Sequence, residues 1–118
     1  MTSGDAVKRG LRMTRPVHID LPPDHRWLVL DILRAHLPSS TKAWVFGSRT
    51  SGRAKRYSDL DLAIDAGRRL TLDETARLRE TFSESDLPYR VDLVDWHDIN
   101  DHWRQAIVAH RVALTEGA

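Results

Sequence analysis

The chain has 118 residues, which suffices for one domain with a hydrophobic core but not for two. Hydrophobic residues make up 41% and charged residues 30%, as in soluble globular proteins, and no apolar run has the length of a membrane span or a signal peptide. A formal net charge of +1 argues against a general nucleic-acid surface, and the absence of cysteine excludes disulfides, thiolate catalysis and cysteine-based zinc sites. We therefore expect a cytoplasmic protein that binds neither membranes nor, directly, nucleic acid.

The chain begins with residues 1–17, which show no hydrophobic periodicity. We expect them to form a flexible extension ahead of a single domain over residues 18–118. A helix is predicted within residues 21–38, with Asp24 as its N-cap and Pro38 at its end. Its apolar side chains recur at helical spacing: Leu28, Val29, Ile32, Leu33 and Leu37.

Two strands are predicted next, separated by a basic stretch. Residues 42–46, KAWVF, are aromatic and β-branched and stop at Gly47, which predicts a short buried strand. Residues 49–56 carry four Arg or Lys residues and no acid. Residues 58–65, SDLDLAID, alternate strictly, which predicts a strand with one apolar face and one open, acidic face. The apolar face comprises Leu60, Leu62 and Ile64, and the open face comprises Asp59, Asp61, Ala63 and Asp65.

The second half of the chain predicts a helix, a strand and a last helix. A capping box from Thr71 to Glu74 begins the first of these. Its apolar stripe is expected to comprise Leu72, Leu78 and Phe82. Residues 89–96 predict a strand, and residues 98–114 predict a helix capped by Asp98 and then a short strand. This order predicts an α/β (α+β) architecture, with helices packed on a small sheet.

Asp59 and Asp61 carry the strongest chemical signal, because they lie two residues apart on one strand and project to the same side. Carboxylates bind hard divalent ions such as Mg²⁺, usually together with phosphate oxygens and water. The alternative is an edge strand whose acids prevent aggregation. Asp92 would share their face if the two strands are neighbours. Asp95 points to the opposite face and is expected as a surface or capping acid.

The Gly47-Ser48 pair ends the first strand and predicts a turn that binds phosphate. Backbone N–H groups in such a turn can point at an anion, and Gly47 permits a close approach. Ser48 adds a hydroxyl donor. The alternative is an ordinary turn followed by solvated basic residues.

Histidine and tryptophan carry less of the functional signal. The six histidines show no metal-binding spacing, so a zinc site is not expected. The four tryptophans are expected mostly as core anchors, although the strand position of Trp96 would also allow contact with a base. They are Trp27, Trp44, Trp96 and Trp103.

Gly47-Ser48, ten further residues and then Asp59-Leu-Asp61 resemble the signature of the DNA polymerase β-like nucleotidyltransferase superfamily, and Asp92 matches its third carboxylate. The short chain resembles the minimal nucleotidyltransferases of that superfamily, over residues 21–115. Members often carry a glycine in the turn before the last strand, where this chain has His110-Arg111-Val112. The resemblance implies the nucleotidyltransferase fold, with a small mixed β-sheet.

The resemblance also implies an activity. As catalytic and metal-binding residues it implies Asp59, Asp61 and Asp92, and as nucleotide-binding residues Gly47, Ser48 and Arg49. Two Mg²⁺ ions would assist transfer of AMP from ATP to a hydroxyl group, such as that of a tyrosine, on a HEPN-type toxin protein. This chain would then be the antitoxin of the pair, in a homo- or hetero-oligomer. Two alternatives stay open: a catalytically idle antitoxin that acts by binding, and a small-molecule (aminoglycoside-like) nucleotidyltransferase.

Overall fold

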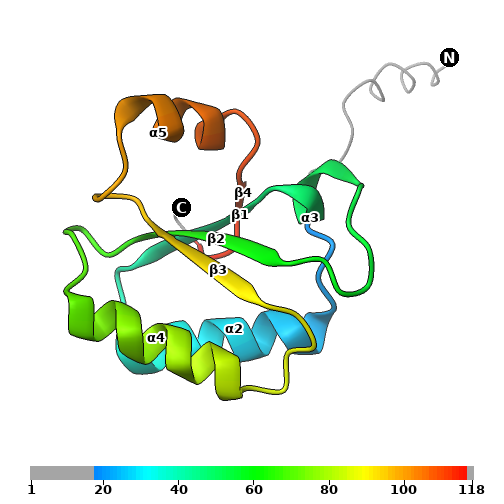
Figure 1. The fold of residues 1–118 in the computed structure, drawn as a ribbon, viewed down its shortest axis with the longest axis horizontal. Coiled ribbons are helices and arrows are strands. Elements are labelled where there is room, and N and C mark those ends of the chain that lie inside the picture. Colours follow the sequence, from blue (N-terminus) through cyan, green and yellow to red (C-terminus); the bar gives the residue numbers. More distant parts are fainter. Residues whose placement is uncertain (1–17, 117–118) are drawn as a thin grey trace, which may run out of the picture.

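A four-stranded mixed sheet, in the order β3-β2-β1-β4, carries helices on both faces (Figure 1). The computed structural model describes residues 18–116, so the extension predicted over residues 1–17 lies outside the described residues. The strands are β1 Lys42–Phe46, β2 Leu60–Asp65, β3 Val91–Asp95 and β4 Val112–Ala113. The helices are α2 Pro23–His36, α3 Ser48–Ser51, α4 Leu72–Glu84 and α5 Asp101–Val108. The predicted α/β architecture is confirmed.

The strand pairings place β1 and β2 in the interior of the sheet. β1 pairs antiparallel with β2 and with β4, whereas β2 pairs parallel with β3. Parallel neighbours need a crossover, and here the chain crosses through α4. The short last strand is confirmed, and the turn before it closes without a glycine, because the N–H of Arg111 donates to the carbonyl of Ile107 (2.8 Å).

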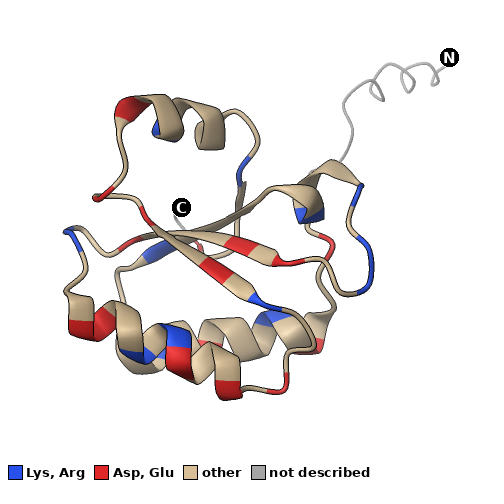
Figure 2. Ribbon diagram, in the orientation of Figure 1, with Lys and Arg blue, Asp and Glu red and all other residues tan. Residues whose placement is uncertain are grey.

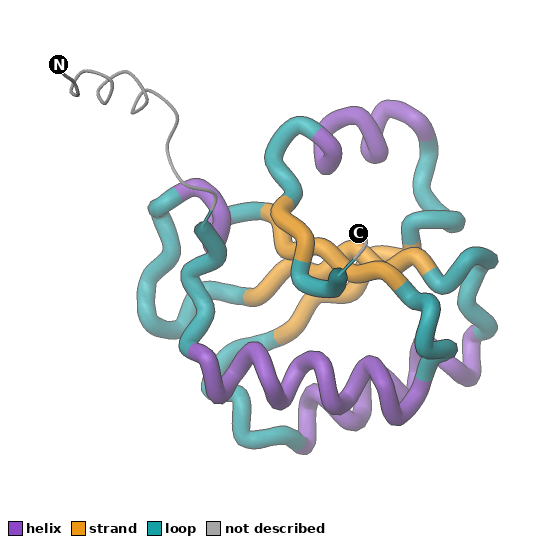
Figure 3. Tube along the Cα trace, turned by 180° about the vertical axis from the view of Figure 1, so that it is seen from behind, coloured by secondary structure: helices purple, strands orange, loops and turns teal. Residues whose placement is uncertain are grey.

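The two faces of the sheet bury different side chains. On one face the fully buried side chains of β2 are Leu60, Leu62 and Ile64. They pack under α2 and α4, which lie together on that side (Figure 3). The other face was predicted to be open, but α5 covers part of it, and Ala63 is fully buried there with Trp44 and Ile107. On this face of β2, only Asp61 and Asp65, on either side of Ala63, stay partly exposed.

Helix α4 follows its sequence signals with one exception. The capping box is confirmed: the Thr71 hydroxyl accepts the N–H of Glu74, and the Glu74 carboxylate accepts the N–H of Thr71. Leu78 is fully buried, but the predicted partner Leu72 is 91% exposed. Six residues correspond to about 1.7 turns of an α-helix, so Leu72 and Leu78 face different sides.

Two predicted helix caps are wrong. Helix α2 begins at Pro23, one residue before Asp24, because proline suits the first turn of a helix. Helix α5 is capped by Asn100, whose side chain accepts the N–H of Trp103 (2.9 Å). Asp98 stays outside that helix because its own N–H closes a turn on the preceding strand.

The large aromatic side chains divide between core and surface. Trp44 is buried, and Trp96 packs against it with ring centroids 5.5 Å apart, in line with the predicted core role. Trp27 and Trp103 are 62% and 52% exposed, so the prediction of core anchors is wrong for these two. Among residues 18–116, no helix has both the length and the apolar character that crossing a membrane demands.

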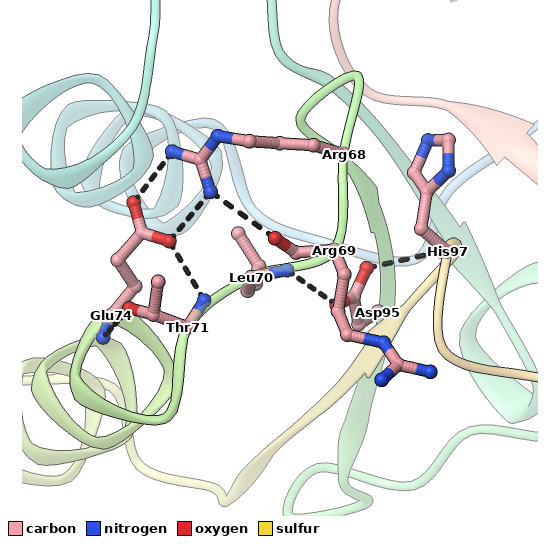
Figure 4. A network of polar contacts seen from close by, with 7 residues as sticks. All are labelled: Arg68, Arg69, Leu70, Thr71, Glu74, Asp95 and His97. Carbon is pink, nitrogen blue, oxygen red and sulfur yellow. Dashed lines mark hydrogen bonds and ion pairs between the residues drawn. The ribbon is translucent and has the colours of Figure 1, made fainter.

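A polar network joins the end of β3 to the start of α4 (Figure 4). The Asp95 carboxylate accepts the N–H groups of Leu70 (2.7 Å) and His97 (3.0 Å), consistent with its predicted capping role. Arg68 donates two hydrogen bonds of 2.8 Å to Glu74. Because these contacts fix the segment after β2 against the end of β3, they help to hold the two parallel strands in register.

Candidate active site

Three predicted carboxylates gather at one end of one sheet face. In the parallel pairing of β2 with β3, Asp61 lies directly opposite Asp92. Asp59 lies two residues before Asp61 and projects toward the same side. Figure 2 shows the acidic segments of β2 and β3 side by side. We refer to Asp59, Asp61 and Asp92 as the acidic cluster.

Gly47 lies directly against the carboxylate of Asp61. Its backbone has φ 79° and ψ −149°, a conformation that residues with side chains rarely adopt. A Cβ atom at this position would overlap the Oδ2 atom of Asp61. The contact follows from the strand register, because Phe46 is opposite Asp61 in the β1–β2 pairing. The turn that the sequence marks for phosphate binding therefore touches the acidic cluster.

The surroundings of Asp61 disfavour its charged form. Partial burial raises the pKa of Asp61 above its ordinary value, and the negative charges of Asp92 and Asp59 raise it further. The guanidinium group of Arg90 lowers the pKa of Asp61 and offsets part of this effect. A cation placed among the three carboxylates would favour their charged forms in the same way, so the cluster attracts positive charge.

Arg90 supplies the positive charge that faces the acidic cluster. Its Nη2 atom lies 3.5 Å from Oδ2 of Asp59, and its Nε atom lies 3.3 Å from Oδ1 of Asp92. The side chain is 74% exposed, so packing does not hold it there. Arg90 is a site residue that was not predicted from the sequence, although its place two residues before Asp92 indicates a shared side of the strand.

The chemistry of the acidic cluster fits Mg²⁺, which prefers carboxylate and other oxygen ligands. As the side chains stand, however, no group of three or more Asp, Glu, His or Cys side chains in residues 18–116 is arranged to hold a metal ion. Two of the three carboxylates contact Arg90 instead. Movement of this one exposed side chain would release both of them.

Ser48 is partly exposed at the start of α3, beside the exposed Gly47. The carbonyl of Gly47 accepts both the N–H (3.1 Å) and the hydroxyl (3.0 Å) of Thr50, which closes the helical turn. No side chain in the described residues caps this four-residue helix. The predicted phosphate turn thus presents its backbone and the Ser48 hydroxyl next to the acidic cluster.

Arg49 is placed differently from the predicted phosphate contact. Its side chain is buried, and its guanidinium donates to the carbonyls of Asp20 (2.9 Å), Arg56 (3.2 Å) and Ser58 (2.8 and 3.2 Å). It also stacks over the ring of Tyr89, 4.0 Å from the centroid. These bonds use most of the five N–H groups of the guanidinium, so Arg49 holds the basic loop in place and is not a phosphate ligand.

Asp65 shares the strand face of Asp61 but belongs to another contact. Its carboxylate bonds Nε2 of His97 (2.6 Å) and the N–H of Gly67 (2.8 Å). Partial burial raises the pKa of Asp65, but the bonds from Gly67 and His97 outweigh this effect and leave the pKa below its ordinary value. The carboxylate of Asp65 therefore already has two hydrogen-bond partners within the fold and does not belong to the acidic cluster.

Comparison with known proteins identifies related sequences over most of the chain. A family model described as "Polymerase beta, Nucleotidyltransferase" matches residues 30–117. A Haemophilus influenzae protein named "Probable protein adenylyltransferase MntA" is 43% identical over 104 residues, which is 88% of this chain and 90% of the relative.

Solved structures show the same fold. A chain from a toxin-antitoxin structure with AMP-PNP superposes with a TM-score of 0.67 at 28% identity, covering 76% of this chain and 72% of the other. A second match comes from a complex of a tri-AMPylated Shewanella oneidensis HEPN toxin with an MNT antitoxin. Its TM-score is 0.60 at 26% identity, covering 76% of this chain and 68% of the other.

Proposed function

Since the chain belongs to the polymerase β nucleotidyltransferase family, we propose that it transfers AMP from ATP to a hydroxyl group of a HEPN-type toxin protein. The reaction would require Mg²⁺ and would silence the toxin, which makes this chain an antitoxin. The proposal combines an arrangement of residues in this structure with the named activities of its relatives.

The observation that carries the proposal is the junction of Gly47, Asp61 and Asp92. Strand pairing sets Asp61 opposite Asp92, and the turn at Gly47 packs on the same carboxylate. A sheet does not need two carboxylates opposite each other for stability, because like charges directly across a strand pair are unfavourable. An arrangement that costs stability and adjoins a phosphate-type turn supports a catalytic role.

In the proposed site, Asp59, Asp61 and Asp92 would hold Mg²⁺. When bound, Mg²⁺ would neutralise the negative charge of the triphosphate and of the leaving group. Gly47 offers its backbone, and Ser48 its hydroxyl, to the phosphates. Binding of the ion would compete with the contacts that Arg90 makes with Asp59 and Asp92.

The proposed reaction is a single displacement at the α-phosphorus of ATP. The acceptor oxygen forms a bond to that phosphorus while the bond to the bridging oxygen of the β-phosphate breaks, and pyrophosphate leaves. The proton of the acceptor hydroxyl passes to the carboxylate of Asp92, which acts as the general base. The product is a phosphodiester between AMP and the acceptor.

The solved relatives support the proposed partner. One matched structure is a complex of an MNT antitoxin with an AMPylated HEPN toxin, and another is a toxin-antitoxin structure with AMP-PNP. The curated relative bears the name of a protein adenylyltransferase and spans nearly the same length as this chain. We therefore expect a hydroxyl side chain of a toxin protein as the acceptor.

The experiment incubates the purified protein with α-labelled ATP, Mg²⁺ and a purified HEPN-type toxin protein. Label is expected on the toxin with the native protein and to be absent with the double variant Asp59→Asn/Asp61→Asn. Asp65→Asn is the matched control, because it changes the same residue type on the same strand face outside the acidic cluster. Thermal unfolding of each variant verifies that the fold is retained.

Three outcomes would replace the proposal. Label transfer that survives the double substitution would exclude the acidic cluster as the catalytic centre. Full silencing of the toxin by the double variant, at unchanged stability of the complex, would indicate an idle antitoxin that acts by binding. Labelling of an aminoglycoside-type hydroxyl compound, and not of the toxin, would indicate the small-molecule transferase.

A further inference from the structure

A hollow of about 530 Å³ lies between the Gly47–Ser48 turn and α5. Phe46, Trp103 and Ile107 line it with apolar surface, and Ser48, Arg53 and His110 contribute polar groups. The volume is in the range of small-molecule sites, and so is the combination of apolar walls with a few polar groups. Apart from Gly47 and Ser48, no residue that lines this hollow has a role in the proposed reaction.

The hollow is continuous with the candidate active site. Phe46 is the strand partner of Asp61, and Gly47 contacts the Asp61 carboxylate while also lining the hollow. A molecule that places one end on the acidic cluster and crosses the Gly47–Ser48 turn therefore reaches the hollow next. A nucleoside triphosphate has this form, with a charged end and an aromatic end.

Trp103 is the most informative residue of the hollow. Its side chain is 52% exposed, although Ile107, one helical turn later, is 2% exposed and packs against the sheet. A single exposed tryptophan is common on protein surfaces, so the feature that distinguishes Trp103 is its place in the hollow beside the Gly47–Ser48 turn. Its flat indole and the ring of Phe46 are surfaces on which a base can stack.

We propose that this hollow binds the purine nucleoside of the donor nucleotide, with the base against Trp103 and Phe46. The phosphates then lie on the Gly47–Ser48 turn, and Arg53 and His110 face the polar edges of the nucleoside. This assignment rests on the proposed function, because it names where the rest of the same substrate binds. The donor nucleotide would then be recognised in two parts: its phosphates by the Gly47–Ser48 turn and its nucleoside by the apolar hollow.

A second exposed tryptophan allows a matched comparison. Trp27 is 62% exposed and lines a hollow of about 490 Å³ on the α2 side of the sheet, together with Arg26 and Leu114. That hollow resembles the first in volume but includes no residue of the acidic cluster or of the Gly47–Ser48 turn. Exposure of tryptophan is common to the two sites, and only the Trp103 site adjoins the phosphate turn.

The test compares two ligands that share the phosphate chain but differ in the nucleoside. Binding of ATP and of inorganic tripolyphosphate, each with Mg²⁺, is measured by titration calorimetry for the native protein and for Trp103→Ala and Trp27→Ala. Trp103→Ala is expected to weaken ATP binding by about tenfold or more, the usual effect of losing one base-stacking aromatic. Tripolyphosphate binding should stay within about twofold, and Trp27→Ala should change neither ligand.

Each other result contradicts the assignment in a recognisable way. Unchanged ATP binding by Trp103→Ala, or equal loss of both ligands, would exclude a nucleoside site. If that variant binds ATP normally but no longer binds the toxin, the hollow is a protein-docking surface. Native protein that binds neither ligand would overturn the proposed function as well. Trp103→Phe keeps an aromatic ring and should retain most ATP affinity, which separates stacking from damage to α5.

Discussion

Gly47 and Asp61 are in direct contact, so that the turn after β1 and the acid on β2 form one continuous surface. The contact depends on the absence of a side chain at Gly47 and on the strand register that sets Phe46 opposite Asp61. A change at either residue therefore acts on both halves of the proposed site.

Gly47→Ala is expected to abolish nucleotide and metal binding and to lower the free energy of unfolding by about 1–3 kcal/mol, the usual cost of a disfavoured backbone conformation. The added methyl group would also displace the Asp61 carboxylate. Gly67→Ala is the matched control, because Gly67 has φ 81° but nothing within 4 Å of the added atom. Urea denaturation and Mn²⁺ titration check both variants, and similar metal affinities would contradict the prediction.

Arg90→Met is expected to strengthen divalent-metal binding in the absence of nucleotide. The substitution removes a positive charge that contacts Asp59 and Asp92 and so competes with the ion. Exposed ion pairs contribute modestly, so affinity for Mn²⁺ should rise by up to about fivefold, measured by electron paramagnetic resonance. Arg77→Met, which breaks the exposed pair with Asp73, should leave Mn²⁺ affinity unchanged. Weaker binding by Arg90→Met would show that Arg90 assists the ion.

Arg49→Ala is expected to reduce stability by about 3 kcal/mol, because the carbonyls that its guanidinium satisfies would lose charged donors. Arg53→Ala, an exposed arginine four residues later, should change stability by less than about 0.5 kcal/mol. Urea denaturation measures both. Equal stabilities would contradict the structural role assigned to Arg49.

The Glu74→Gln variant tests the polar network at the start of α4. Bonds from Arg68 and from the N–H of Thr71 lower the pKa of Glu74 from 4.5 to about 2. A lowered carboxyl pKa stabilises the fold fully above the unfolded value of 4.5, and this stabilisation declines as the pH falls towards 2. The difference in melting temperature between native protein and Glu74→Gln should therefore be largest at neutral pH and shrink below pH 4.5. A constant difference across this range would contradict the assignment.

The sequence predicted the sheet well because alternation is a local property. Leu60 and Leu62 had to share a face, and the stop at Gly47 marked the end of β1. One error concerns the choice between two nearby polar residues, Asp98 and Asn100, as the cap of α5. Both residues are suitable caps, and the turn that excluded Asp98 depends on a contact with the end of β3.

Only those parts of the candidate site that follow from the spacing of residues along a strand could be predicted from the sequence. The positions of Asp61 and Asp92 on one face followed from parity once their strands were assumed to be neighbours. Spacing could not show that Arg49 turns inward to backbone carbonyls, because that depends on the path of the loop after α3. Likewise the exposure of Trp103 depends on where α5 lies over the sheet, which no local pattern encodes.

β3 is an edge strand of the described sheet, so the parts of the candidate site differ in how firmly backbone hydrogen bonds hold them. Asp61 belongs to β2 and Gly47 directly follows β1, and both of these strands have hydrogen-bonded neighbours on both sides. Asp92 comes from a strand paired on one side only, and border strands open locally at lower free energy than interior ones. Amide hydrogen exchange should thus be faster in β3 than in β2, and each local opening of β3 would separate Asp92 from Asp59 and Asp61.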